Sequence, residues 1–557
     1  MASQAFDYDV LIAGAGPVGL GLAIELGQRG IKARVVERND RVGYTPRAKT
    51  SNVRTREHLR RWGIADNLRR ASPIPPDYPP DVVFATRMNG HELARFKNAF
   101  NGRREKNELY SEEAQWVPQY TVEEVLRAHA ATLTSVAITF DTELTAVEQD
   151  AAGVTAELLD LGSGARTTVR AQYLVGADGA RSFVRTAIGA RMQGDGDGIK
   201  NYNIVFRSPD FADKHTLGKA IMYWIVNADV PSVIGPMDDH DLWAFIATKL
   251  PANVELESLD AAKLIRDSTG LHDIQIEILR KDPWVSRSLV ADTYSSGRMF
   301  LAGDACHLHP PFGGFGMNMG VGDAVDLGWK LAATLQGWGG PELLASYEPE
   351  RRPVHERTIA ESKINYATVG NQLVQPAIEE PGETGDAARL AVGSAIQATK
   401  IREFSTLGLV LGARYRDSAI LVSDGTEPPA EHFSDYVPTA FPGCLAPHAW
   451  LADGSSLYDH FGQGYTLLVT GEAVATDAVG AEAIVVEAGR RGMPLTVVIP
   501  RDARLPGLYA ARLALIRPDQ HVAWRGDALP ADIAGLLDHV TGFRAADDAK
   551  MLRSAAE

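Results

Sequence analysis

A glycine-rich turn near the amino terminus constrains the fold of this 557-residue chain more than any other feature. The apolar segment Asp9–Ala13 predicts a buried strand, residues 20–26 predict a helix, and Ala33–Val36 predict a second strand that ends at Glu37. The turn between the first strand and the helix reads Gly14-Ala-Gly16-Pro-Val-Gly19. In a β-α-β unit, such glycines let the backbone approach a pyrophosphate, and an acid after the second strand binds a ribose.

The turn therefore predicts a dinucleotide site, and by itself it leaves FAD and NAD as alternatives. A lone G-x-G-x-x-G pattern is weak evidence, but its place in a complete β-α-β unit with an acid at the end makes it strong. The candidate cofactor residues in this unit are Gly14, Gly16, Pro17, Val18, Gly19, Glu37 and Arg38.

A second stretch, residues 297–332, repeats the order of strand, glycine-rich turn and helix. Met299–Ala302 predicts a short strand that ends at Gly303 and Asp304, and residues 319–335 have helical apolar spacing. Four glycines and two prolines lie between His309 and Gly320, so the backbone can approach a flat ligand closely. The free amides at the helix start would stabilise negative charge on that ligand.

Residues Gly303–Ala324 resemble the second flavin fingerprint of the class A flavoprotein aromatic hydroxylases, the para-hydroxybenzoate and phenol hydroxylase family. The family pattern is G-D-A-A-H-x-x-P-P-x-G-G-x-G-x-N-x-G-x-x-D-A, and here Cys306 replaces an alanine. Shortly after it, Asp326 stands where the family usually has asparagine. The segment that begins at Gly443 resembles the opening of the C-terminal domain in the longer, phenol-hydroxylase-like members. The resemblance spans most of the chain and implies FAD as the bound dinucleotide.

The resemblance also implies cofactor contacts outside the first turn. Family members carry a cofactor-contacting arginine in the loop that corresponds to Arg47, although a solvated surface arginine remains the alternative reading. In the family, a glutamine just before the helix that corresponds to 121–131 binds the cofactor, and this residue is Gln119 here. The family also has a cofactor-binding Asp-Gly pair after a strand, and its aspartate corresponds to Asp178. The second fingerprint adds Gly303, Asp304, Pro311, Gly316, Met317 and Asn318.

By resemblance, the chain is an FAD-dependent monooxygenase that consumes NADH or NADPH and O2 and hydroxylates a phenolic aromatic compound. The family forms a flavin C4a-hydroperoxide whose terminal oxygen attacks an electron-rich ring. The backbone of Pro310, Pro311, Gly313 and Gly314 is expected near the reacting atoms, because this loop must face the flavin. The sequence assigns no catalytic base and no metal ligand, and it leaves a homodimer open.

The fold predicted from these features is α/β, with a Rossmann-like FAD-binding domain, an inserted β-rich substrate domain and a C-terminal thioredoxin-like domain. The FAD-binding domain comprises 1–182 and 285–370, with 76–110 as a candidate contribution to the substrate domain at 183–284. A helical linker at 371–430 leads to the C-terminal domain at 431–557. Aromatic residues at strand spacing are more often core than ligand contacts, but Tyr223, Trp243 and Phe245 are the candidate substrate residues.

Composition excludes several other classes of protein. A net charge of −15 argues against nucleic acid or an anionic membrane surface as the partner. No apolar run reaches the roughly 20 residues of a membrane span, and no signal peptide is evident, so a cytoplasmic protein is expected. The two cysteines, Cys306 and Cys444, form no CxxC motif, which argues against a zinc site, a disulfide framework or a redox role for the C-terminal domain.

Two alternatives remain open from the sequence. The first is another reaction on the same fold, such as Baeyer–Villiger oxygenation of a ketone, whereas the Trp-x-Trp-x-Ile-Pro segment of halogenases is missing. The second is a non-catalytic protein that binds FAD or sequesters a ligand. Reduction of the flavin by NAD(P)H in the presence of aromatic ligands would separate an enzyme from such a binding protein.

Overall fold

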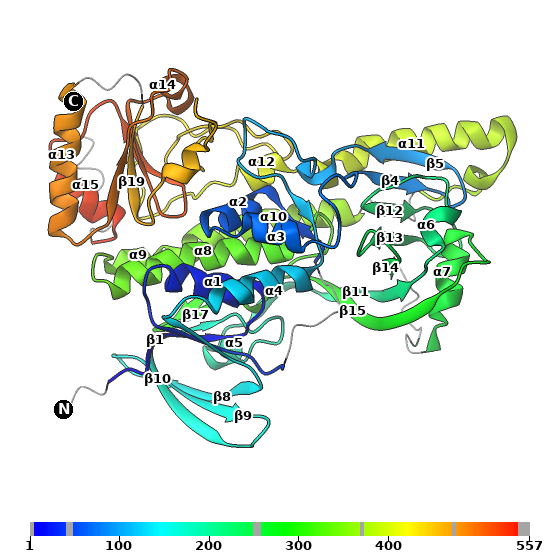
Figure 1. Cartoon of the computed structure of the whole chain (residues 1–557), viewed down its shortest axis with the longest axis horizontal. Helices are drawn as coiled ribbons and strands as arrows, with labels where there is room; N and C mark the ends of the chain where they lie inside the picture. Colours follow the sequence, from blue (N-terminus) through cyan, green and yellow to red (C-terminus); the bar gives the residue numbers. More distant parts are fainter. Residues whose placement is uncertain are drawn as a thin grey trace.

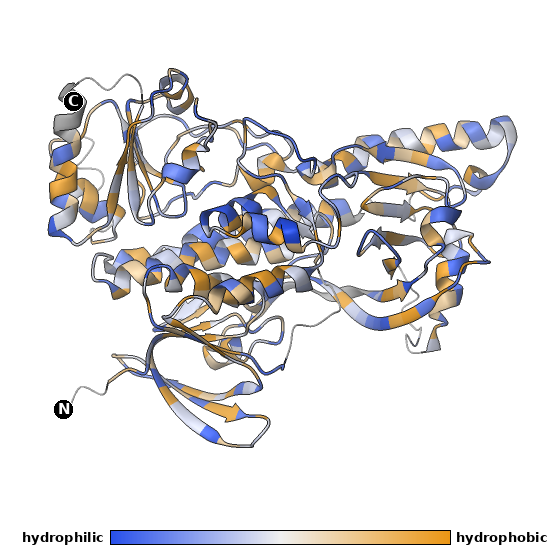
Figure 2. Ribbon diagram, in the orientation of Figure 1, coloured by the Kyte–Doolittle hydropathy of each residue, from blue (hydrophilic) through white to orange (hydrophobic). Residues whose placement is uncertain are grey.

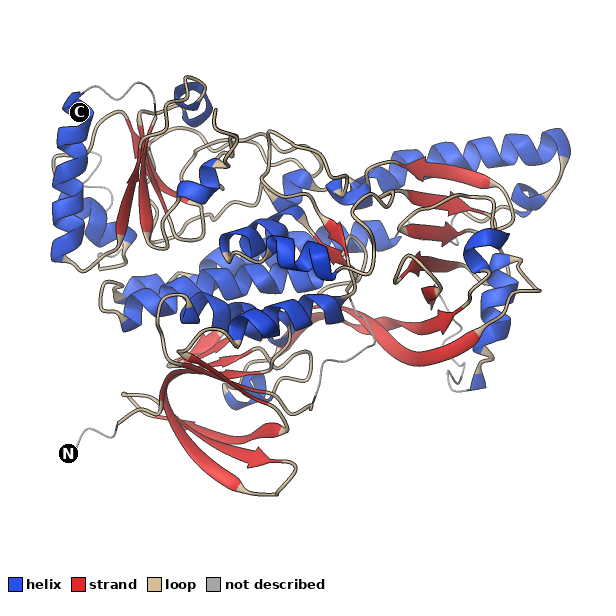
Figure 3. Cartoon of the chain, in the orientation of Figure 1, coloured by secondary structure: helices blue, strands red, loops and turns tan. Residues whose placement is uncertain are grey.

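The computed structural model describes residues 5–40, 48–248, 255, 258–367, 373–470 and 475–543. Two eight-stranded sheets and one four-stranded sheet lie in different parts of the molecule, with helices between them (Figure 3). Arg47, one of the predicted cofactor residues, lies outside the described residues.

The first sheet contains the predicted β-α-β unit. Its order is β16-β17-β10-β1-β2-β7, and β8 and β9 form an antiparallel extension on β10. The strands from β17 to β7 are parallel, so their carboxyl ends, which carry the ligand-binding residues of such sheets, share one edge. The bounds are β1 Tyr8–Ala13, β2 Ala33–Val36, β7 Val136–Thr139, β8 Thr142–Gln149, β9 Val154–Asp160, β10 Arg166–Gly176, β16 Ser295–Ser296 and β17 Met299–Leu301.

Helices α1 (Pro17–Gly27) and α8 (Phe315–Leu335) pack side by side between the first sheet and the C-terminal domain (Figure 1). Glycines bring them close: a Cβ at Gly328 would lie 2.6 Å from Cβ of Glu25. Both helices are coloured mainly hydrophobic in Figure 2, because they are buried on several sides. Helices α2 Val53–Arg61, α3 Ala65–Ala71 and α4 Gln119–Ala130 extend this layer, while α5 Phe183–Ala187, α9 Pro341–Ala345 and α10 Tyr347–Ala367 border it.

The second sheet is connected to the first through two long, paired strands, β11 (Met192–Arg207) and β15 (Glu277–Ala291). Its order is β18-β15-β11-β14-β13-β12-β4-β5, so the strands from the segment 76–110 form one edge. Helices α6 (Phe211–Lys214) and α7 (Ala261–Thr269) cover one face, and α11 (Gly382–Phe404) packs along β5 (Figure 1). The other bounds are β4 Val82–Ala85, β5 Glu92–Phe96, β12 Met222–Ile225, β13 Ser232–Pro236, β14 Leu242–Ala247 and β18 His307–Leu308; a separate two-stranded sheet pairs β3 Thr50–Ser51 with β6 Gln115–Trp116.

The C-terminal part contains a four-stranded sheet of order β20-β19-β21-β22, in which only the β19–β20 pair is parallel. It shares a hydrophobic core with α8, since Trp329 and Trp338 pack against Tyr465. The bounds are β19 Tyr465–Val469, β20 Leu495–Val498, β21 Leu513–Ile516, β22 Val522–Gly526, α12 Leu407–Val410, α13 Ala475–Arg490, α14 Leu505–Tyr509 and α15 Ile533–Val540.

A buried ionic network, which we call the α8 charge cluster, fastens this part to α8. It consists of Asp326, Lys330, Glu350, Arg517 and Asp519. The Arg517 guanidinium lies 2.9 Å from Asp326, 2.7 Å from Glu350 and 2.7 Å from Asp519, and its side chain is fully buried. Asp326 stands where the family usually has asparagine, and here its carboxylate pairs with two cations, Arg517 and Lys330.

Neither described cysteine is placed for disulfide or redox chemistry. Both are buried and free, and burial raises the pKa of the Cys444 thiol to about 12. A thiol of this kind is unreactive at neutral pH, because the thiolate is the reactive species. Among the described helices, none is long and apolar enough to span a membrane.

Candidate functional site

A cavity of about 930 Å³ opens between the carboxyl edge of the first sheet and one face of the second sheet. This volume lies near the upper end of the roughly 300–1,000 Å³ found for small-molecule and cofactor sites. One half, which we call the cofactor half because the predicted cofactor residues line it, is formed by residues after β1, β2 and β10 and by the start of α4. The other half, which we call the substrate half because the predicted substrate domain lines it, is formed by β11–β15 of the second sheet, and the loop at 308–317 lies between the halves.

The three glycines of the first turn have different local environments. Gly14 has φ +102°, and a Cβ there would lie 2.4 Å from the carbonyl oxygen of Ala177. A Cβ at Gly19 would lie 2.0 Å from the oxygen of Gly14, so both of these positions are fixed by the fold. A Cβ at Gly16 would meet no atom of the described residues within 4 Å, and this residue lines the cavity with Pro17 and Val18. The open space at Gly16 lies at the start of α1, where helix amides favour an anion.

The end of β2 is organised around Glu37. Its carboxylate accepts hydrogen bonds from the N–H of Ala15 at 2.9 Å and of Asn39 at 3.0 Å. The first of these contacts ties the acid to the glycine turn. Glu37 and Arg38 both line the cavity, so this edge presents a carboxylate and a guanidinium side by side.

Two further predicted cofactor residues line the same half and also stabilise local structure. Gln119 is the first residue of α4, and its Oε1 accepts a hydrogen bond of 3.1 Å from the N–H of Ala48. Asp178 accepts hydrogen bonds from the Ser182 hydroxyl at 2.5 Å and from the Val184 N–H at 3.1 Å. Asp178 thereby binds the N-cap residue Ser182 and an amide in the first turn of α5, so its carboxylate has structural partners as well as a place in the cavity wall.

The loop between β18 and α8 lines the centre of the cavity. Of the residues predicted there, Asp304, Pro310, Pro311, Gly313, Gly314, Gly316 and Met317 all form part of the wall. Gly19, Gly303 and Asn318 do not line it. The Asn318 side chain instead joins α8 to the β3 segment, since Oδ1 accepts from the Asn52 N–H and Nδ2 donates to the Thr50 oxygen, both at 2.9 Å.

Behind the loop, a buried carboxylate on α8 holds the second fingerprint in place. Asp323 accepts hydrogen bonds from the Gly303 N–H at 3.0 Å and from His307 at 2.8 Å, and it pairs with Arg351 and His355 at 2.9 Å each. Burial opposes ionisation of Asp323, but His355, Arg351 and His307 outweigh it and hold its pKa well below the usual range. The proximity of Cys306, His307 and Asp323 is explained by this arrangement, and we assign no metal to it.

The prediction that Tyr223, Trp243 and Phe245 face the substrate is wrong. These side chains lie in a buried core with α6 and α7, on the opposite face of the second sheet. The Tyr223 hydroxyl donates to the carbonyl oxygen of Gly218 at 2.5 Å. Side chains alternate along a strand, so it is the neighbouring residues that line the cavity: Met222, Trp224, Ala244 and Ile246.

Ionisable residues that were not among the predicted site residues also line the cavity, and they include Lys49, His309 and Glu403. Lys49 is half-buried, and its desolvation lowers its pKa to about 8. Both ring nitrogens of His309 are buried without a hydrogen-bond partner among the described residues. Glu403, at the end of α11, reaches the cavity from the segment that the sequence assigned to a linker. Glu403 is brought here by tertiary structure, and only its place as an acid among the apolar residues 401–411 could have hinted at it. His309, by contrast, directly precedes Pro310 of the predicted loop.

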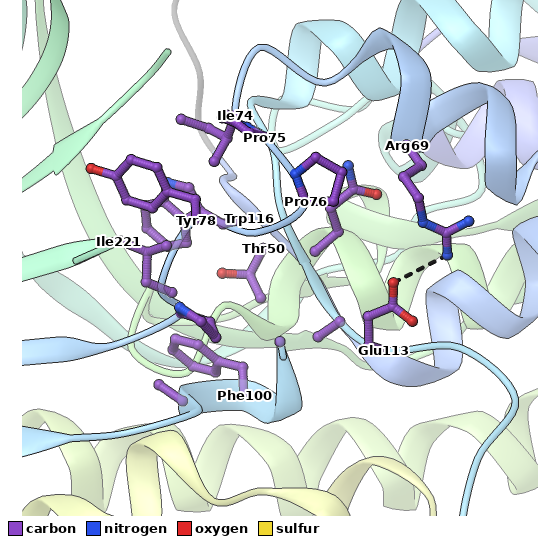
Figure 4. Close-up of a pocket in the computed structure, with 15 residues that line it drawn as sticks. Thr50, Arg69, Ile74, Pro75, Pro76, Tyr78, Phe100, Glu113, Trp116 and Ile221 are labelled. Carbon is purple, nitrogen blue, oxygen red and sulfur yellow. Dashed lines mark hydrogen bonds and ion pairs between the residues drawn. The ribbon is translucent and has the colours of Figure 1, made fainter. Parts of the chain in front are cut away.

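A smaller cavity of about 50 Å³ adjoins the main one and shares Thr50, Phe100 and Trp116 with it. The segment with Pro75, Pro76 and Tyr78 forms its outer wall, and the Arg69–Glu113 ion pair of 3.1 Å lies at one side (Figure 4). Its lining is mostly apolar, so it suits a small substituent of a ligand that extends beyond the main cavity.

Comparisons with known proteins identify the family of this chain. Residues 7–362 match a family described as an FAD binding domain, and residues 439–543 match one described as the C-terminal part of aromatic-ring hydroxylases. A putative polyketide hydroxylase from Streptomyces halstedii is 33% identical over 94% of both chains.

Two solved structures are also similar. RebC with bound 7-carboxy-K252c is 36% identical, with a TM-score of 0.89 over 97% of this chain and 100% of RebC. A ternary complex of aklavinone-11 hydroxylase with FAD and aklavinone is 29% identical, with a TM-score of 0.83 over 97% of this chain and 100% of that one.

Proposed function

Because this chain belongs to the FAD-dependent aromatic-ring monooxygenases of class A, we propose that it hydroxylates a phenolic compound with NADH or NADPH as reductant and O2 as oxygen source. One observation carries the proposal: a single cavity runs from the open space at Gly16, past the Pro310–Gly314 loop, to an apolar sheet face. A cofactor and an aromatic substrate would meet at that loop.

The residues of the cofactor half fit FAD. Among the described residues beyond its chain neighbours, no atom lies within 4 Å of a Cβ at Gly16, which leaves room for a pyrophosphate at the amino end of α1. Glu37 stands where it would accept hydrogen bonds from the adenosine ribose, with Arg38 beside it. On the other side, Gln119 and Asp304 would contact the ribityl chain, and Asp178 would lie near the pyrophosphate. Arg47 remains a predicted contact.

When bound and reduced, FAD would supply the activation of O2 and the transfer of one oxygen atom to the substrate ring. The chain itself would position the ring and exclude water. The backbone of Pro310, Pro311, Gly313 and Gly314 would face both molecules, and the start of α8 would stabilise negative charge on the flavin. Buried apolar walls would also keep the reacting atoms away from solvent.

The substrate half favours a planar ring system, from one ring to several fused rings. Trp224 lines it and stacks on Phe84 with a 5.6 Å centroid distance, which fixes the indole as a flat surface. Met222, Ala244 and Ile246 continue the apolar wall. The bound 7-carboxy-K252c of RebC and the aklavinone of aklavinone-11 hydroxylase support a large substrate, because both structures resemble this chain along nearly its whole length.

We expect the FAD-loaded protein to consume NADH or NADPH faster with a suitable phenol than without one, and to incorporate one oxygen atom from O2. The measurement is a panel of single-ring and fused-ring phenols, with 18O2 and mass spectrometry of the product. Product that carries no label would contradict the proposal, as would turnover of non-aromatic ketones alone.

We further propose that the C-terminal part, from residue 431, is a thioredoxin-like domain with a structural role, while 1–182 with 285–370 bind FAD. The mixed four-stranded sheet and flanking helices support this assignment. Replacing Cys444 with alanine should leave turnover within about twofold of wild type, because its buried, protonated thiol has no partner for dithiol exchange. Steady-state rates with flavin content as the control test this. A large loss of rate at full flavin content would indicate a redox role.

A further inference from the structure

The carboxylate of Glu403 is the one acidic side chain of α11 that lines the cavity among the described residues. It lies in the last turn of that helix, and its side chain is only 3% exposed. Helix α11 packs along the edge strand β5, where a Cβ at Gly393 would lie 2.3 Å from the carbonyl oxygen of Leu93. The backbone of α11 is thus held against the second sheet, and Glu403 is held at the substrate half.

Two contacts orient this carboxylate. The Nζ of Lys400, which is fully buried, lies 3.1 Å from Oε2 of Glu403 and donates a further hydrogen bond of 2.8 Å to the Asn365 oxygen. The backbone N–H of Gly313 lies near the Glu403 carboxylate and acts to lower its pKa. Glu403 is therefore close to the loop that, in the proposed function, faces both the flavin and the substrate.

The electrostatic environment suits a group that takes up a proton. Burial raises the pKa of Glu403 above its ordinary value, although Lys400 and the Gly313 N–H oppose this shift. The position in the last helical turn also disfavours negative charge, because the helix carbonyls point towards it. A general base works best when its pKa is closer to the working pH than that of an exposed glutamate. Other titratable groups in the walls nearby are Lys49, Asp282, Arg287 and His309.

We propose that Glu403 is the catalytic base that accepts the proton of the substrate's phenolic hydroxyl, and that Lys400 is its positioning residue. The inference rests on the proposed function. The phenolic O–H bond breaks, its electron pair stays on the phenolate oxygen, and a new O–H bond forms on the Glu403 carboxylate. The electron-rich phenolate is the form most readily oxygenated. Glu403 then releases the proton to solvent when the site opens for product release.

The decisive variant is Glu403→Gln. Glutamine keeps the shape and an oxygen near the Gly313 N–H, but it cannot take up a proton at neutral pH. The matched control is Glu383→Gln, an exposed glutamate at the start of the same helix. Flavin content and thermal unfolding of both variants should equal those of wild type, which shows that the fold and the cofactor half are unchanged.

The first readout is turnover of the best phenol of the panel and of its fluorinated analogues, whose hydroxyl is already ionised at the assay pH. Glu403→Gln should lower kcat by about a hundredfold or more for the parent phenol. The loss should shrink to a few-fold for the ionised analogues. The second readout needs no turnover: after a rapid rise in pH, the absorbance of the bound phenolate should appear more slowly in Glu403→Gln than in wild type, because the proton has lost its acceptor.

The outcomes separate this inference from the proposed function. Wild-type protein that oxygenates none of the phenols would overturn the proposed function itself. Active wild type with an equally active Glu403→Gln would overturn only the role of Glu403, and Lys49→Met and His309→Gln would then be compared in the same way. An equal loss for parent and ionised phenols, or an unchanged rate of phenolate formation, would show that Glu403 only positions the loop.

Discussion

Replacing Gly16 with valine should abolish most FAD binding while the apoprotein keeps its fold. The backbone at Gly16 has φ −73° and ψ −179°, which valine adopts without strain, and the new side chain would meet no protein atom near its Cβ. It would instead fill the space where the pyrophosphate approaches the backbone. Crowding of this kind costs about 1–3 kcal/mol, which corresponds to roughly 5- to 140-fold weaker binding.

The measurement is flavin absorbance after purification, followed by titration of the apoprotein with FAD and by its thermal unfolding. Gly489→Val is the matched control, because a Cβ there also meets nothing within 4 Å and the residue is exposed in α13, far from the cavity. Full flavin retention by Gly16→Val would mean that the pyrophosphate does not approach this turn. A lower unfolding temperature of the apoprotein would instead mean that the glycine has a structural role.

Replacing Arg517 with methionine should destabilise the protein by about 3–5 kcal/mol, the usual cost of leaving buried charges without their partner. Asp326, Glu350 and Asp519 would lose a fully buried guanidinium that contacts all three. Urea unfolding followed by tryptophan fluorescence measures the loss, and Arg501→Met, at an exposed position, is the control. A decrease in the free energy of unfolding of less than about 1 kcal/mol would show that the α8 charge cluster is not needed to attach the C-terminal part to α8.

Asp326→Asn tests the same cluster through pH. Burial raises the pKa of Asp326 to about 7, despite the opposing effects of Lys330 and Arg517. The folded state therefore binds a proton at Asp326 more tightly than the unfolded chain does. This proton binding contributes its full share to the free energy of unfolding below about pH 4, and the contribution is lost as the pH rises through about 7. The asparagine variant should show a smaller decrease in stability over this window than wild type.

Local sequence was sufficient to predict how the residues of the cofactor half are placed relative to one another. Gly14, Gly16 and Glu37 belong to one β-α-β unit whose geometry follows from neighbouring residues, so their mutual positions could be predicted. The loop from Pro310 to Gly314 was predicted to line the site for the same reason, since strand, turn and helix follow one another directly.

The substrate half could not be predicted in this way. Tyr223, Trp243 and Phe245 were chosen for their aromatic character, but a strand places successive side chains on opposite faces, and the sequence does not say which face is covered by helices. Glu403 is 90 residues beyond the Gly313 that it lies near, and only the packing of α11 on β5 brings them together. Asp326 was recognised as a departure from the family, but its partner Arg517 lies in another sheet.

The strand order of the first sheet has a consequence for how the chain folds during its synthesis. β10 pairs with β1 from the start of the chain and with β17, whose residues Met299–Leu301 are made more than a hundred positions after β10 ends. The intervening residues build most of a second sheet. A nascent chain that ends near residue 182 therefore has an open, apolar strand edge, and such non-local pairing is slow and prone to aggregation. The first sheet can close only after residue 301 has been synthesised, so we expect chaperone protection over this interval to raise the yield of folded protein.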